Sequence, residues 1–164
     1  EEHHGLALPR DLLVEFSAHV QQLTEQLDRE VKPDEIYQAL LDTYGADSGP
    51  YRLVDYDLLA GREEDQRCVA RVDVSDNVVT IDGEGSGPIE AFVNAMAATL
   101  NEPLTVLGYQ ETALGTGADA QAICILSIDD PDTNVRCYGL GISRNTITAS
   151  LNAVVSALLS LIHI

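Results

Sequence analysis

The feature that most constrains this chain is an internal repeat in its C-terminal part. The segments AFVNAMAATL (91–100) and ASLNAVVSAL (149–158) carry Ala, Asn, Ala and Leu at the same four positions, and a Gly-x-Gly precedes each. Three short strand-like runs precede each of these helix-like segments in the same order. Such self-similarity is typical of two copies of one supersecondary unit. The sequence therefore predicts an α+β fold with two βββα units related by a pseudo-twofold axis.

Alternation of apolar and polar residues, broken by polar turns such as Asp76-Asn77, predicts the strands of both units. The predicted elements are strands over 51–60, 68–75 and 77–83 with a helix over 88–100, then strands over 103–112, 120–129 and 135–142 with a helix over 145–161. The last helix carries almost no charge, which is too apolar for a solvated helix. We expect it to lie under a sheet and the domain to form a dimer.

Two amphipathic helices are predicted before the repeat. Pro9 suits the first turn of a helix, and apolar residues then recur at helical spacing: Leu12, Leu13, Phe16, Val20, Leu23 and Leu27. A second helix should begin at Pro33 and end at Gly45. The sequence thus predicts a helical linker subdomain over 1–46, a short connection, ADSGP, and a second domain over 51–164.

The charge balance excludes one class of partner. Nine basic residues, with Lys32 the only lysine, stand against 27 acidic ones, for a net charge of −18. Nucleic-acid surfaces need clustered Lys and Arg, so no nucleic-acid partner is expected.

Cys68, Cys124 and Cys137 lie in apolar runs at spacings unlike those of zinc sites, which indicates buried, reduced thiols and a cytoplasmic protein. From the sequence we expect neither a signal peptide nor a membrane-spanning segment. The chain opens EEHHG, with His3 and His4 suggesting linker residues, and its single methionine is Met96, so we expect a piece of a longer protein.

A prediction about stability follows from the high net charge. Self-repulsion among the acidic groups should weaken the fold at low ionic strength, and added salt screens it. The melting temperature should therefore rise from low to moderate salt. A melting temperature that stays flat or falls over that range would contradict this expectation.

Catalytic motifs are missing from the sequence. The glycine-rich segments GEGSGP and GLGISR lack the spacing of dinucleotide or phosphate loops, and neither HExxH nor GxSxG occurs. His19 falls inside a helix and His163 near the end, so general-base histidines are lacking. We expect no catalytic residue, metal site or cofactor in this chain.

A binding site without chemistry is the stronger expectation. Helix starts after Gly87 and near 145–146 should offer backbone N–H groups to a carboxylate. Glu90, Glu111 or Asp119 could accept an ammonium group, and the alanines of 113–122 leave room for a short aliphatic chain. Together these groups describe a branched-chain amino acid. The alternative is structural: the glycines form turns and the alanines pack helix against sheet.

Several segments resemble one known family. HGLALPRDLLVEFSAHVQ (4–21) is similar to the linker of long-form 2-isopropylmalate synthases. Three further segments resemble the C-terminal regulatory domain of that family: GSGPIEAFVNAM (85–96), YQETALGTGADAQA (109–122) and GLGISRNTITASLNAVVSAL (139–158). The resemblance covers essentially the whole chain, with the motifs in the family's order. It departs from the family pattern at Ser86, Glu90, Thr112 and Thr146.

The resemblance implies a dimerising domain that binds L-leucine as feedback inhibitor. By position, the leucine pocket falls on Gly85, Gly87, Glu90, Tyr109, Ala113, Ala120 and Thr146. The family's catalytic barrel would lie elsewhere in the parent protein, where it condenses acetyl-CoA with 3-methyl-2-oxobutanoate using a divalent metal ion. Three alternatives stay open: an isoleucine-sensing domain of citramalate synthase, a purely structural dimerisation module, and an independent enzyme.

Overall fold

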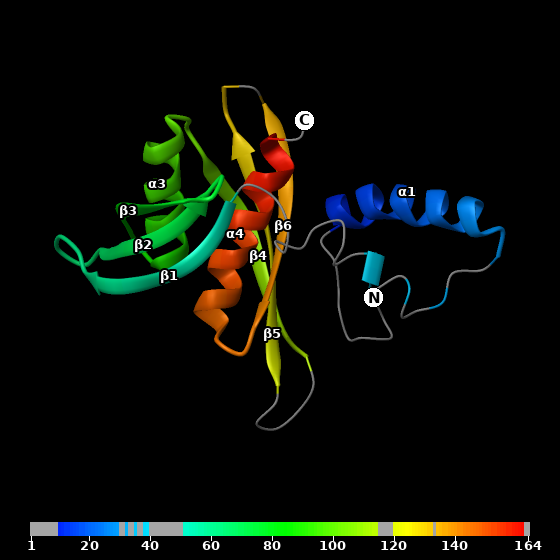
Figure 1. The fold of residues 1–164 in the computed structure, drawn as a ribbon, viewed down its shortest axis with the longest axis horizontal. Coiled ribbons are helices and arrows are strands. Elements are labelled where there is room, and N and C mark those ends of the chain that lie inside the picture. Colours follow the sequence, from blue (N-terminus) through cyan, green and yellow to red (C-terminus); the bar gives the residue numbers. More distant parts are fainter. Residues whose placement is uncertain are drawn as a thin grey trace.

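The computed structural model describes residues 10–29, 51–114, 120–132 and 134–162, together with Lys32, Glu35, Gln38 and Ala39. Two three-stranded antiparallel sheets, ordered β1-β2-β3 and β4-β5-β6, are each followed by a helix (Figure 1). The elements are α1 (Arg10–Leu27), β1 (Tyr51–Ala60), β2 (Gln66–Val74), β3 (Asn77–Gly85), α3 (Pro88–Leu100), β4 (Thr105–Leu114), β5 (Gln121–Asp130), β6 (Val135–Ser143) and α4 (Thr146–Ile162). The predicted α+β fold with two βββα units is confirmed, and every predicted bound within the units is correct to within two residues.

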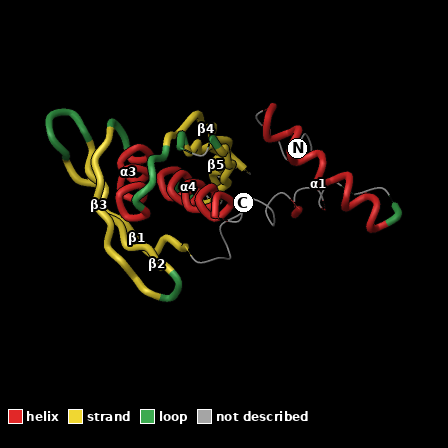
Figure 2. Tube along the Cα trace, turned by 90° about the horizontal axis from the view of Figure 1, so that it is seen from above, coloured by secondary structure: helices red, strands yellow, loops and turns green. Residues whose placement is uncertain are grey.

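The two helices of the units form a layer between the two sheets. Helix α3 packs on β3 and β2, and α4 packs on β6 and β5. Figure 2 shows α3 and α4 side by side with one sheet on either side of them. Each helix also reaches the first strand of the other unit, since α4 contacts β1 and α3 contacts β4. These two crossed contacts join each helix to the edge strand of the opposite unit.

Helix α4 is the centre of the core. Every side chain from Ala149 to Leu159 is buried except the half-buried Asn152. The expectation that this apolar helix lies under a sheet is therefore confirmed. Because its apolar surface is covered within the chain, its composition no longer argues for association with a second chain.

Small residues let α4 approach β6 very closely. A Cβ atom added to Gly139 would lie 2.0 Å from the carbonyl oxygen of Ala153 and 2.4 Å from the amide nitrogen of Ala157. In the first unit, a Cβ on Gly83 would lie 2.5 Å from the carbonyl oxygen of Ala91. Real Cβ atoms do not approach backbone atoms this closely, so glycine is required here. The structural alternative expected these glycines to form turns, but they lie within β3 and β6; its other half, that the alanines pack helix against sheet, is correct.

The outer face of the first sheet carries many charged side chains. Cross-strand ion pairs link its strands: Arg52 with Asp73, Arg71 with Asp55, and Arg67 with Asp82. The Arg67 guanidinium lowers the pKa of the Asp82 carboxyl. Exposed pairs of this kind contribute little to stability. Their consequence is a hydrated face that cannot belong to the apolar core.

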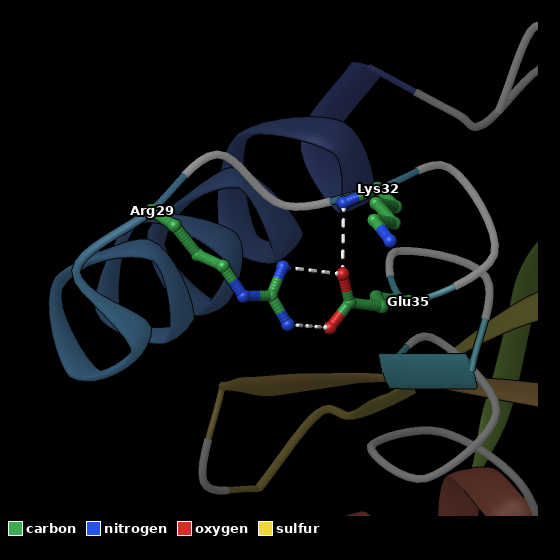
Figure 3. Close-up of polar contacts among 3 residues, drawn as sticks. All are labelled: Arg29, Lys32 and Glu35. Atoms are coloured by element: carbon green, nitrogen blue, oxygen red, sulfur yellow. Dashed lines mark hydrogen bonds and ion pairs between the residues drawn. The ribbon is translucent and has the colours of Figure 1, made fainter.

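Helix α1 lies to one side of the two units in both views (Figures 1 and 2). Figure 3 shows that Arg29, just after α1, forms two hydrogen bonds of 2.8 Å to the Glu35 carboxylate, and the Lys32 amide donates a third at 3.1 Å. These donors lower the pKa of Glu35 to about 2, with the Arg29 hydrogen bonds the largest cause. Of the predicted second helix, Glu35, Gln38 and Ala39 are described and helical, and Gly45 lies outside the described residues.

None of the three cysteines forms a disulfide and all three are buried, as the sequence predicts. Burial raises the pKa of both Cys68 and Cys124 to about 11, from an ordinary value of 9.0. Because the core disfavours the charged thiolate, the two thiols stabilise the fold fully below pH 9. That stabilisation is lost as the pH rises from 9 to about 11.

We therefore predict that the native chain resists a thiol reagent at pH 8, because all three thiols are buried and those of Cys68 and Cys124 stay protonated. All three thiols should react once the chain is unfolded in denaturant. Counting modified cysteines by mass spectrometry checks this, and rapid native labelling of Cys68 or Cys124 would contradict the buried placement.

Candidate functional site

A cavity of about 540 Å³ opens where the start of α3, the strand β4 and the first turns of α4 meet. Its size falls within the roughly 300–1,000 Å³ typical of small-molecule sites. The lining residues come from both units: Ser86, Gly87, Pro88, Ile89, Glu90, Val93, Asn94, Leu104, Thr105, Val106, Tyr109, Glu111, Ile147 and Ser150. The cavity therefore depends on the crossed packing of α3 against the second unit.

Aliphatic side chains form one wall. Ile89 and Val93 lie one turn apart on α3 and present the same helix face, while Val106 comes from β4 and Ile147 from α4. Leu104 precedes β4 and adds to this wall. Such a surface suits a short branched hydrocarbon chain better than a polar one.

Two carboxylates supply the charge of the cavity. Glu90 accepts a 2.9 Å hydrogen bond from the Ser86 hydroxyl, and Glu111 accepts one of 3.1 Å from the Ser150 hydroxyl. Among the described residues, the lining contains neither Lys nor Arg, so the cavity is negatively charged near both groups. This charge favours a ligand that carries an ammonium group.

The two helix starts differ in their capping. At α4, the Asn145 side chain accepts hydrogen bonds from the amides of Ile147 (2.9 Å) and Thr148 (3.1 Å). At α3, Gly87 stands in the N-cap position with extended backbone and no side-chain cap. The prediction that both starts offer free amides is thus wrong for α4, because Asn145 occupies them. The start of α3 keeps the partial positive charge that favours a carboxylate.

Of the residues predicted for the pocket, the cavity brings together Gly87, Glu90 and Tyr109. Gly85 is buried directly behind the start of α3, where a Cβ would lie 2.7 Å from the Ala91 amide nitrogen.

Three predicted residues do not line the cavity. Ala113 pairs with Ala122, which pairs with Ser143 just before α4. Ala113 and Thr146 therefore lie at the same end of the second unit, and Ala120 directly precedes β5. Asp119, a candidate partner for an ammonium group, lies outside the described residues.

Sequence reasoning missed several lining residues, chiefly Val93, Asn94, Val106, Ile147 and Ser150. The apolar ones follow ordinary helix or strand periodicity and cannot be told from core residues by pattern. Asn94 offered a usable signal, because the repeat holds asparagine at this position in both units. Its amide donates a 2.7 Å hydrogen bond to the Glu84 carbonyl, which ties α3 to the end of β3.

Among the described residues, no three His, Cys, Asp or Glu side chains gather as metal ligands. None of the described helices has the length and apolar character of a membrane span.

The sequence over residues 30–162 matches the model of one family, the LeuA allosteric (dimerisation) domain. The chain is similar to a 2-isopropylmalate synthase of Ralstonia nicotianae, with 38% identity over 155 residues, which are 94% of this chain and 27% of the relative. A 2-isopropylmalate synthase of Rhizobium meliloti is 33% identical over 160 residues, 96% of this chain and 28% of the relative. The mitochondrial 2-isopropylmalate synthase 2 of Saccharomyces cerevisiae is 32% identical over 167 residues, 97% of this chain and 28% of the relative. The chain thus spans just over a quarter of the length of these relatives.

Proposed function

This chain belongs to the family of LeuA allosteric (dimerisation) domains, and from that membership we propose that it is the regulatory part of a 2-isopropylmalate synthase. In this proposal it binds L-leucine and lowers the activity of a catalytic barrel in the parent protein. The parent condenses acetyl-CoA with 3-methyl-2-oxobutanoate with the help of a divalent metal ion. No step of that reaction is assigned to the residues of this chain.

The observation that carries the proposal is the composition of the cavity. Leucine has three recognisable parts: a carboxylate, an ammonium group and an isobutyl chain. The uncapped start of α3 suits the first, Glu90 and Glu111 suit the second, and the wall around Val93 and Ile147 suits the third. A purely structural cavity has no need for all three within one space.

Calorimetric titration of the chain with L-leucine and L-isoleucine tests the proposal. We expect saturable binding of leucine, with isoleucine weaker because its branch lies one carbon nearer the ammonium group. Tighter binding of isoleucine would favour the citramalate synthase alternative. Absence of heat with either amino acid, supported by an unchanged melting temperature, would indicate a structural module.

Association is a separate part of the proposal. We propose that the chain forms a homodimer, in keeping with the family's description as a dimerisation domain. Two large apolar side chains on the edge strand β4, Leu107 (45% exposed) and Tyr109 (57% exposed), suit burial against a second copy. Sedimentation at micromolar concentration should give a dimer, and a monomer both with and without leucine would contradict this part.

A further inference from the structure

The pseudo-twofold axis gives the cavity a counterpart. The cavity lies between the start of α3 and β4, so its counterpart lies between the start of α4 and β1, which also contact one another. We propose that this counterpart is a second copy of the ligand cleft, held shut by a direct hydrogen bond between Tyr56 and Thr148. The inference rests on the proposed function only for what the open cleft binds.

The strands fix which tyrosines correspond. Both β1 and β4 are edge strands with an irregularity in register at the same place, between Leu53 and Asp55 in β1 and between Val106 and Gly108 in β4. The residue three positions after the start of each irregularity is a tyrosine. These two residues are Tyr56 in the first unit and Tyr109 in the second.

The helices fix the partner residues. In each unit, a glycine of the third strand closely approaches an alanine near the helix start, Ala91 in α3 and Ala149 in α4. The residues directly before these alanines, Glu90 and Thr148, are therefore counterparts. Glu90 and Thr148 therefore occupy equivalent corners of the two units. Each corner also holds the tyrosine of the opposite unit's edge strand.

The two corners are in different states. Tyr56 and Thr148 share a hydrogen bond of 2.7 Å between their hydroxyl oxygens, and Tyr56 is only partly exposed. Tyr109 is 57% exposed, while the Glu90 carboxylate is held by Ser86. The first corner is thus bridged from strand to helix, and the second opens into the cavity.

The features that suit a zwitterion occur only in the open copy of the cleft, which is the cavity between α3 and β4. They are missing from the closed copy, between α4 and β1. Gly87 corresponds to Asn145, which caps its helix and removes the two amides from use. Glu111 of β4 corresponds to the aliphatic Leu58 of β1. Because the closed copy folds without these features, the fold itself does not require them in the open copy.

A double-mutant cycle with Tyr56→Phe and Thr148→Val tests the closure without any ligand. One hydrogen bond contributes about 1 kcal/mol, so each single variant should raise the unfolding equilibrium constant roughly fivefold. The double variant should lose little more, because both changes remove the same bond. Tyr109→Phe, the matched control, should stay within about twofold of the parent. Additive losses, or an equal loss in Tyr109→Phe, would overturn the closure.

Calorimetry then tests the number of sites. The unsubstituted chain should bind one L-leucine per chain. The variant with Leu58→Glu, Asn145→Gly and Thr148→Glu should gain a second, weaker leucine-binding site. Two equal sites in the unsubstituted chain would overturn the inference. If no leucine binds at all, the proposed ligand fails, and the double-mutant cycle still decides whether the counterpart is held shut.

Discussion

Gly139→Ala should lower the melting temperature by about 6–12 °C. The added Cβ would lie 2.0 Å from the Ala153 carbonyl oxygen and 2.4 Å from the Ala157 amide nitrogen, and both are backbone atoms of α4. No side-chain rotation can relieve these contacts, so β6 and α4 must separate along the centre of the core. Overpacking costs about 1–3 kcal/mol, and we expect the upper end. In a domain of this size each kcal/mol corresponds to roughly 2–4 °C.

Gly108→Ala is the matched control, because nothing lies within 4 Å of the position of its added Cβ. Its melting temperature should stay within about 2 °C of the parent, consistent with a surface substitution of small effect. Thermal unfolding followed by circular dichroism compares the two variants directly. Equal melting temperatures for the Gly139→Ala variant and the unsubstituted chain would contradict the close approach of β6 to α4.

Glu111→Gln should weaken leucine binding roughly 10- to 150-fold with little change in stability. The glutamine oxygen can still accept the hydrogen bond from the Ser150 hydroxyl, so the fold keeps its contact. What disappears is the charge that faces the ammonium group, and a hydrogen bond to a charged group is worth about 1.5–3 kcal/mol. Calorimetry gives the change in affinity, and thermal unfolding shows that the variant is folded.

Glu64→Gln removes the same charge from an exposed residue between β1 and β2, outside the cavity. Leucine affinity should be unchanged in this control. If both variants weaken binding equally, the effect belongs to net charge and not to the cavity. In the full-length parent, Glu111→Gln should relieve inhibition by leucine while turnover stays near normal.

Ala120→Leu separates two hypotheses about the pocket. The family resemblance places Ala120 beside the isobutyl group, where three added carbons should weaken binding roughly 5- to 150-fold through overpacking. The cavity between α3 and β4 does not include Ala120. Weakened binding in Ala120→Leu but not in Glu111→Gln would move the ligand toward the end of the second unit that holds Ala113 and Thr146.

The sequence was sufficient for the architecture because its signals are local. Strand alternation, the helix start at Pro88 and the repeated Ala/Asn pattern each act over a few residues, and all agree with the structure. Asn145 before Thr146 is an ordinary N-cap signal that would have predicted the closed start of α4. The differences between the two helix starts were therefore within reach of the sequence.

The cavity was less predictable because it depends on contacts between the units. Val93 and Val106 follow the periodicity of core residues, and only the crossed packing of α3 against β4 exposes them to the same space. Conversely, Gly83 and Gly139, which could have marked a ligand site, are needed where helix and sheet meet. Small residues alone did not distinguish a binding site from tight packing.

A crystal structure of the chain with L-leucine tests the central claim most directly. We predict leucine between α3 and β4, with its ammonium nitrogen within hydrogen-bonding distance of the Glu90 or Glu111 carboxylate. Its carboxylate should face the start of α3, and its isobutyl group should contact Val93 and Ile147. Leucine bound instead beside Ala113, Ala120 and Thr146, or a cavity without leucine at saturating concentration, would contradict the account.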